Sequence, residues 1–238
     1  MQKFLSAIAL FITVTVAHAD INQKCPQFRA GISSYTAGNG DQEICHSNYA
    51  VIHSCKVKAP IAVFEHLTIA TISGSAKRKD NFGPDPLVTP NCSATLADYA
   101  TVGKTHDRGH MAPAASNTQN DTIMSESFYL SNIVAQNAGN NRGAWRLLEI
   151  EERELARQPG TDYYVVSGGV FDVGHPVTGN GLGIPTRLYK IIYEKNSKKV
   201  RAFLMPNESI RPAGDWRKYE TTLADVETAT GIKFNLGK

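Results

Sequence analysis

A histidine flanked by charged residues and a glycine lies near the middle of the chain, in the segment Asp107-Arg108-Gly109-His110. A histidine can take a proton from water near neutral pH when a partner fixes its orientation and tautomer. Arginine offers a planar fork of donors that fits a phosphate, and glycine lets the backbone turn tightly. The segment suits phosphodiester hydrolysis, although such a pattern alone is more often a structural histidine.

Two asparagines and a glutamate follow downstream, at Asn132, Asn141 and Glu149. If Asn141 opens a helix, Trp145 and Glu149 follow it at four-residue steps and share one face with it. Amide and carboxylate oxygens are hard ligands that suit Mg²⁺, which keeps most of its waters and takes one or two protein ligands. Taken alone, these residues are equally typical of helix caps and surface positions.

The combination resembles the DRGH-type DNA/RNA non-specific endonuclease family of ββα-metal nucleases, which includes mitochondrial endonuclease G. That family has an asparagine followed by a glutamine, a second asparagine, a tryptophan and a Leu-Glu pair at fixed offsets. Every offset agrees with Asn132, Gln136, Asn141, Trp145 and Leu148-Glu149. With weaker similarity on either side, the resemblance covers roughly residues 61–234.

The chain departs from the family pattern at two places. Ala135 stands where the family usually has a proline, which loosens the loop without removing a functional group. The family also has a catalytic arginine upstream, and the matching segment here is Lys77-Arg78-Lys79-Asp80. We assign that role to Arg78.

The resemblance implies a magnesium-dependent mechanism, with Mn²⁺ as a substitute ion. His110 is the general base that takes a proton from the attacking water. Asn141 is the direct metal ligand, and Glu149 holds the metal through a water. Arg108 and Arg78 bind the scissile phosphate.

The same resemblance makes Asn132 a catalytic-site residue that orients His110 or the loop around it. The implied activity is cleavage of DNA and RNA without strong sequence preference, giving 5′-phosphorylated products. Three alternatives remain open: a nucleic-acid-binding or uptake protein that has lost catalysis, a metal phosphodiesterase for small substrates, and a toxin. A toxin often needs a cognate inhibitor protein, which this sequence does not reveal.

The N-terminus resembles a secretory signal peptide spanning residues 1–19. Lys3 is followed by an apolar run, Phe4 to Val16, which is short for a membrane span. Ala17-His18-Ala19 offers small residues for cleavage after Ala19, and a polar stretch follows. The alternatives are an uncleaved anchor or a buried strand. Cleavage predicts a secreted or periplasmic protein with no membrane association.

Four cysteines follow the predicted signal peptide, at Cys25, Cys45, Cys55 and Cys92. An even number in an exported chain favours two disulfides, and three pairings are open. Zinc binding is the alternative, but the spacing lacks a CxxC pair. The formal net charge of +3 fits a polyanionic substrate without demonstrating one.

The hydrophobic pattern predicts an α+β fold with a mainly antiparallel sheet, because strands and helices do not alternate as βαβ units. Residues 20–60 form a Cys-containing extension, and residues 61–238 form the endonuclease domain. The chain has 238 residues, enough for one large domain. Strands are predicted at 61–73, 163–170, 188–193 and 200–205, and helices at 121–132, 144–158 and 221–230.

Overall fold

The computed structural model describes residues 24–28, 40–234 and 236. The predicted signal peptide therefore lies outside the described residues. Within the described part of the chain, none of the helices has the length and apolar character needed to cross a membrane.

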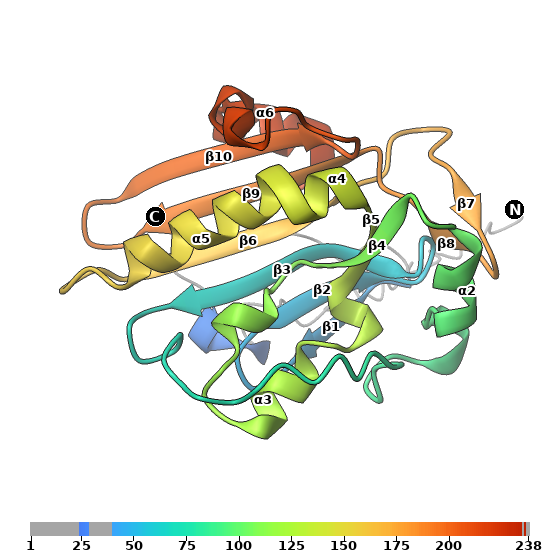
Figure 1. Ribbon diagram of the computed structural model, residues 1–238, viewed down its shortest axis with the longest axis horizontal. Helices are drawn as coiled ribbons and strands as arrows, with labels where there is room; N and C mark the ends of the chain where they lie inside the picture. Colours follow the sequence, from blue (N-terminus) through green and yellow to red (C-terminus); the bar gives the residue numbers. More distant parts are fainter. Residues whose placement is uncertain (1–23, 29–39, 235, 237–238) are drawn as a thin grey trace, which may run out of the picture.

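A seven-stranded sheet forms the centre of the molecule (Figure 1). Each neighbouring pair of its strands is antiparallel. This arrangement confirms the predicted α+β class. In their order across the sheet, the strands are β1 (Gln42–Cys45), β2 (Ala50–Ser54), β3 (Ala59–Leu67), β6 (Tyr163–Val170), β9 (Arg187–Glu194), β10 (Lys199–Pro206) and β11 (Glu220–Thr221).

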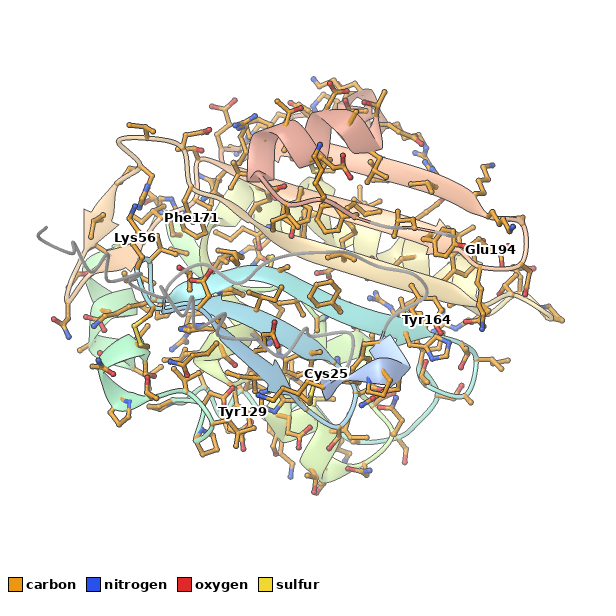
Figure 2. All side chains as sticks on the ribbon, turned by 180° about the vertical axis from the view of Figure 1, so that it is seen from behind. Cys25, Lys56, Tyr129, Tyr164, Phe171 and Glu194 are labelled. Carbon is orange, nitrogen blue, oxygen red and sulfur yellow. A yellow bond between two sulfur atoms is a disulfide. The ribbon has the colours of Figure 1, made fainter. Side chains whose placement is uncertain are left out.

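Both faces of this sheet are covered, because successive side chains of a strand point to opposite faces. Val165 packs in the apolar core that contains Trp145 and Leu148, beneath helix α5 (Arg146–Ala156). Its neighbour Val166 packs in a second core with Val226 of helix α6 (Leu223–Thr230). Figure 2 shows this second face, on which Tyr164 is labelled. The result is a sheet between two helical layers.

Local sequence signals account for the ends of helix α6. Thr222 and Asp225 form a reciprocal capping box at its start. Gly231 ends it with a φ of 70°, a left-handed conformation that glycine adopts without steric cost. Both ends of the helix are therefore set by residues of its own sequence, close to the predicted range of 221–230.

Other helices are shorter than the sequence pattern predicts. Helix α3 covers only Asp121–Glu126, and its cap is Asn120 rather than Asp121. A turn then leads to a 3-10 segment, Leu130–Asn132. The stretch at 74–105, expected to be irregular, contains helix α2 (Leu96–Thr101) with its own capping box. The remaining short elements are η1 (Pro26–Phe28), η2 (Pro90–Cys92), η3 (Ala114–Ser116), β7 (Val177–Thr178), β8 (Leu182–Gly183) and η6 (Ala213–Tyr219).

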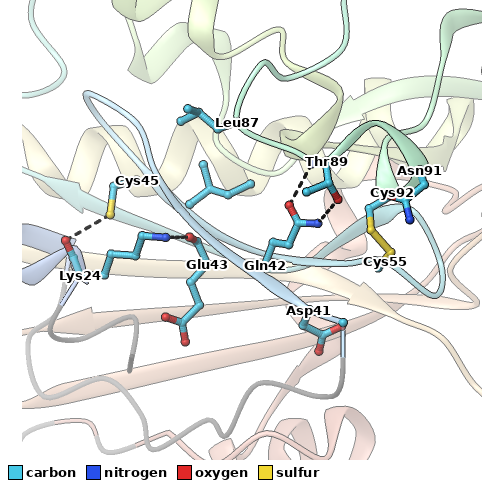
Figure 3. Close-up of a pocket in the computed structure, with 12 residues that line it drawn as sticks. Lys24, Asp41, Gln42, Glu43, Cys45, Cys55, Leu87, Thr89, Asn91 and Cys92 are labelled. Atoms are coloured by element: carbon cyan, nitrogen blue, oxygen red, sulfur yellow. Dashed lines mark hydrogen bonds between the residues drawn. A yellow bond between two sulfur atoms is a disulfide. The ribbon is translucent and has the colours of Figure 1, made fainter. Parts of the chain in front are cut away.

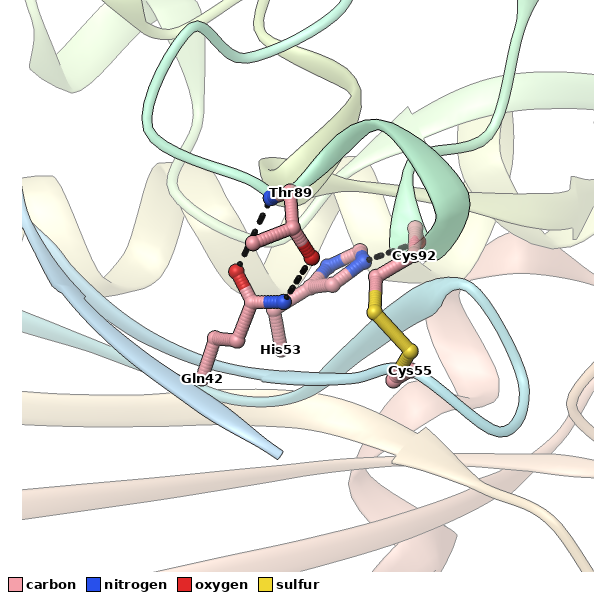
Figure 4. Close-up of a disulfide and its surroundings, with 5 residues drawn as sticks. All are labelled: Gln42, His53, Cys55, Thr89 and Cys92. Atoms are coloured by element: carbon pink, nitrogen blue, oxygen red, sulfur yellow. Dashed lines mark hydrogen bonds between the residues drawn. A yellow bond between two sulfur atoms is a disulfide. The ribbon is translucent and has the colours of Figure 1, made fainter. Parts of the chain in front are cut away.

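All four cysteines are paired, as Cys25–Cys45 and Cys55–Cys92. The predicted two disulfides are therefore present, and zinc binding by these thiols is excluded. In Figure 4, the second disulfide lies beside a hydrogen bond of 3.1 Å between His53 Nε2 and the Cys92 carbonyl. A native disulfide in a secreted domain typically contributes about 2–5 kcal/mol.

Two strands of the predicted extension at residues 20–60, β1 and β2, belong to the central sheet. Strand β2 pairs along its whole length with β3, and β1 pairs with β2. A groove runs beside β1 and is lined by Cys45 and by the Cys55–Cys92 disulfide (Figure 3). Gln42 on β1 exchanges two hydrogen bonds with Thr89, which holds the following loop against this edge.

Candidate active site

A two-stranded hairpin carries the DRGH segment. Strand β4 (His106–His110) pairs antiparallel with β5 (Ile133–Asn137), so that Arg108 lies opposite Ala135. In Figure 1, this hairpin lies beside helix α4 (Ala138–Asn140), at one end of the α5 layer. The hairpin and the following helix are therefore adjacent in both sequence and space.

Gly109 is needed for close packing rather than for the tight turn inferred from the sequence. It lies within β4, and its φ is not among the positive values. A Cβ at this position would come within 2.0 Å of Gln136 Oε1. Only glycine leaves room for the buried glutamine amide, whose nitrogen donates to Asn140 Oδ1 at 2.9 Å. The contact connects the hairpin to the start of the helical segment.

The helical segment is kinked between Asn141 and Glu149, the two predicted metal-binding residues. Residues Asn141–Trp145 form a π-helical stretch in which Gly143 has non-helical angles (φ −108°, ψ −106°). Such irregularities are frequent at functional sites. Asn141 and Glu149 line a common cleft, whereas Trp145 is completely buried in the core. Trp145 nevertheless lies within reach of Glu149, since burial raises the pKa of that carboxyl group and the Trp145 side chain opposes the rise.

A cleft of about 390 Å³ brings together five of the six predicted site residues. Its lining combines an imidazole, an amide, a carboxylate and several guanidinium groups. The predicted residues in the lining are Arg78, Arg108, His110, Asn141 and Glu149.

His110 is held against two aromatic rings. Its ring makes an edge contact with Phe128 at 4.9 Å between centroids and a tilted contact with Phe82 at 5.4 Å. Burial, together with the positive charges of Arg78 and Arg108, lowers the pKa of His110 to about 3. Because this pKa lies far below neutrality, the imidazole is uncharged at pH 7.

Asn132, the sixth predicted residue, lies behind the cleft. Its Oδ1 accepts from the Ala112 backbone N–H at 2.8 Å, and its Nδ2 donates to the Ala112 and Ser127 carbonyls at 2.9 and 2.8 Å. The side chain is fully buried. These contacts brace the loop that follows His110, and they leave the amide no hydrogen bond to the imidazole.

Asp107 orients the Asn141 amide. Asn141 Nδ2 donates to Asp107 Oδ2 at 2.8 Å, and Arg142 forms an ion pair with Asp107 at 2.6 Å. These contacts hold the pKa of Asp107 below its ordinary value, against the opposing effect of burial. A carboxylate only accepts hydrogen bonds, so the amide must present its nitrogen to Asp107. Among the described residues, none donates to Asn141 Oδ1, which leaves that oxygen for a ligand.

Glu149 lies at the floor of the cleft above a buried ion pair. Burial raises the pKa of Glu149 to about 7, and the positive charge of Lys190 opposes the rise. Lys190 Nζ lies 2.6 Å from Glu152 Oε2, and both side chains have no exposed surface. Breaking a buried pair of this kind typically costs about 3–5 kcal/mol. The pair therefore fixes α5, and with it Glu149, to strand β9.

The arginines of the cleft come from three segments. Arg78 makes an ion pair with Asp80 at 2.7 Å and stays half exposed. The Arg108 guanidinium stacks over Phe82 at 4.2 Å. The sequence interpretation missed three further arginines from the helical segment, although their spacing relative to Glu149 was a usable signal. They are Arg142, Arg146 and Arg153.

A family model described as "DNA/RNA non-specific endonuclease" matches residues 29–238. The chain belongs to this family. The membership implied by the DRGH segment and its downstream spacing is thereby confirmed.

Two curated relatives show how far this endonuclease family member resembles known proteins. Human "Nuclease EXOG, mitochondrial" is 36% identical over 213 residues, which cover 82% of this chain and 57% of the human protein. The chain thus spans little more than half of that relative. The "Nuclease" of Serratia marcescens is 31% identical over 235 residues, covering 95% of this chain and 86% of that protein.

A solved structure supports the same assignment of the fold. The crystal structure of the EndoG/EndoGI complex contains a chain that superposes with a TM-score of 0.73 at 30% identity. The match covers 82% of this chain and 85% of that chain. The ββα-metal nuclease fold expected for this family is confirmed.

The donor set of this family member fits a hydrated divalent cation. The described residues contain no cluster of three or more His, Cys, Asp or Glu side chains suited to metal binding. They do offer the free Oδ1 of Asn141 and the carboxylate of Glu149 in one cleft. One or two oxygen ligands suit Mg²⁺, because it retains most of its water shell.

Proposed function

We propose that the chain is a Mg²⁺-dependent endonuclease that hydrolyses DNA and RNA to 5′-phosphorylated products. The observation that carries the proposal is the shared cleft, which is lined by an uncharged histidine, the Asn141 amide and several arginines. The family membership supports hydrolysis of nucleic acids as the chemistry. A protein that only binds nucleic acid has no need for this combination of base and ligand.

His110 acts as the general base in this proposal. Its Nε2 is buried and has no hydrogen-bond partner among the described residues, so we assign the proton transfer to the other ring nitrogen, Nδ1. Nδ1 takes a proton from that water as its oxygen attacks phosphorus, and the P–O3′ bond breaks. Asn132 acts as a positioning residue through the loop that it braces.

Asn141 Oδ1 would hold the cation directly, and Glu149 would hold it through a water. Asp107 accepts a hydrogen bond from the Asn141 nitrogen and so leaves the Asn141 oxygen available for the ion. A bound Mg²⁺ supplies Lewis-acid stabilisation of the charge that develops on the phosphate and the leaving oxygen. Mn²⁺ has similar oxygen preferences and is the expected substitute.

Arg78 and Arg108 bind the scissile phosphate and stabilise its developing charge. Contacts to phosphate carry no sequence information, which accounts for cleavage without strong sequence preference. A site that does not read the 2′-hydroxyl accepts both RNA and DNA.

The same proposal includes export with removal of residues 1–19. The two disulfides support an oxidising compartment. An exported location also separates a non-specific nuclease from the genome of its own cell. Mass spectrometry of the mature protein tests this directly, and a mature N-terminus at Asp20 is the expected result.

Digestion of plasmid DNA and of RNA tests the proposed activity. Purified protein should degrade both polymers in Mg²⁺ and neither in excess chelator. The ends should carry 5′-phosphates that ligase accepts without kinase treatment. Full activity in chelator, or cleavage of small phosphodiesters without cleavage of polymers, would contradict the proposal.

Arg108→Ala should weaken nucleic-acid binding and reduce its salt dependence. Each lost phosphate contact lowers the slope of log K against log[salt] by about 1 for duplex DNA. The measurement is Kd for a labelled duplex at several salt concentrations, with Ca²⁺ replacing Mg²⁺ to suppress cleavage. Arg157→Ala is the matched control, since Arg157 pairs with Glu154 and is not part of the cleft lining. Equal slopes for both variants would remove Arg108 from the phosphate site.

A further inference from the structure

His106 lies on the same strand as Arg108 and His110, but the proposed mechanism does not use it. Residues at steps of two along a strand point to one face, so these three side chains share a face of β4. Their cross-strand partners Ala135 and Ile133 pack in the core that contains Tyr99 of α2. The shared face of β4 therefore looks toward helix α2.

A second pocket, of about 300 Å³, lies on this face next to the cleft. Arg108 lines both the cleft and this second pocket. A nucleic-acid strand with its scissile phosphate bound at Arg108 therefore passes beside the second pocket. Helix α2 and the chain just after it form one wall, and β4 forms the other. The lining is Leu96, Tyr99, Ala100, Val102, His106, Asp107 and Arg108.

The chemistry of this pocket suits a flat aromatic group better than a phosphate. Leu96 keeps 43% of its surface exposed and gives the pocket an apolar side wall. Tyr99 donates its hydroxyl to the Ile133 carbonyl at 2.7 Å, so its ring is held rigidly. Burial lowers the pKa of His106, so the ring is uncharged at neutral pH.

We propose that this pocket binds the base of a nucleotide adjacent to the scissile phosphate, with His106 as its stacking partner. The proposal rests on the proposed nuclease function and extends it to a subsite. Stacking on an aromatic ring tolerates every base, because each base has a π-face. A subsite of this kind raises the affinity for nucleic acid and fixes the position of the substrate along the cleft. It does so without a sequence preference, as a non-specific nuclease requires.

A single missing base should reveal the subsite. The probe is an end-labelled single-stranded DNA oligonucleotide with one abasic residue at its centre, cut under single-hit conditions in Mg²⁺. The ladder reports how often each bond is cut. With wild-type protein, one bond near the abasic residue should be cut about 10-fold less often than distant bonds, since a stacked base contributes about that much.

Three variants test the assignment to this pocket. His106→Ala should flatten the dip to 2-fold or less relative to distant bonds, and Ala100→Phe, which fills the pocket from an exposed position on α2, should do the same. His175→Ala is the matched control and should keep the dip, because His175 lines neither the cleft nor this pocket. An even ladder with wild-type protein, or an unchanged dip in His106→Ala and Ala100→Phe, would overturn the proposal. Absence of cutting at every bond would instead refute the nuclease function.

Discussion

Replacing His110 with alanine is expected to lower the single-turnover rate of DNA cleavage by about 10²–10⁴-fold, the usual contribution of a general base. The physical reason is that His110 is the histidine of the cleft that also contains Asn141, Glu149 and the arginines. The binding constant for DNA should stay nearly unchanged, because the phosphate contacts belong to the arginines. The measurement is the cleavage rate of a labelled duplex at saturating enzyme, together with its Kd.

A structural role for His110 predicts a different outcome. The ring packs against Phe82 and Phe128, so truncation could also loosen the fold. His110→Gln fills more of the space and is the control, since an amide is not a useful base near neutral pH. Both variants should lose cleavage while thermal unfolding of His110→Gln stays close to wild type. Activity retained by either purified variant would contradict the assignment.

Asn141→Ala should give the second large loss, and this loss should respond to metal concentration. Removal of the amide oxygen takes away the direct ligand, so we expect the Mg²⁺ concentration at half-maximal activity to rise by about 10–100-fold. High Mg²⁺ should then restore part of the rate. Asn141→Asp keeps an oxygen at the same position and should retain more activity than Asn141→Ala. The measurement is the cleavage rate across a Mg²⁺ titration from chelator-treated protein.

Two results would count against a metal held by Asn141. One is an unchanged Mg²⁺ titration in Asn141→Ala, and the other is wild-type activity in excess chelator. Asn140→Ala is not a suitable control, because Asn140 donates to the Pro206 carbonyl and helps to anchor the segment. Asn196→Ala is a better control. This exposed asparagine donates to the Gly160 carbonyl and does not line the cleft.

Local signals in the sequence predicted those parts of the structure that depend on neighbouring residues. The Thr222 capping box and the Gly231 stop are local, and both are present. The cleft residues were also predictable, because Asn141 follows the DRGH hairpin directly and Glu149 lies in the same helical segment. Residues that are close in the sequence cannot lie far apart in space. This limit constrains the positions of Asn141 and Glu149 more strongly than their helix propensities do.

Contacts between distant segments were not predictable in this way. Gly109 is explained only by the approach of Gln136 from the opposite strand. The helical segment is kinked at Gly143, and Trp145 just after the kink lies in the core. A prediction from a regular helix of 3.6 residues per turn takes no account of such a kink. Cysteine pairing depends on which segments meet in the fold, because three pairings satisfy the composition equally well. Cys25 reaches Cys45 at the end of β1, and Cys55 in the β2–β3 turn reaches Cys92 in the loop after β3.

The most direct test of the catalytic assignment is chemical rescue of His110→Ala. Free imidazole added at neutral pH can enter the space left by the ring and take the proton from water in its place. The account predicts that cleavage of labelled DNA by this variant rises with imidazole concentration, and only when Mg²⁺ is present. Cleavage by His110→Ala at the wild-type rate without imidazole would contradict it.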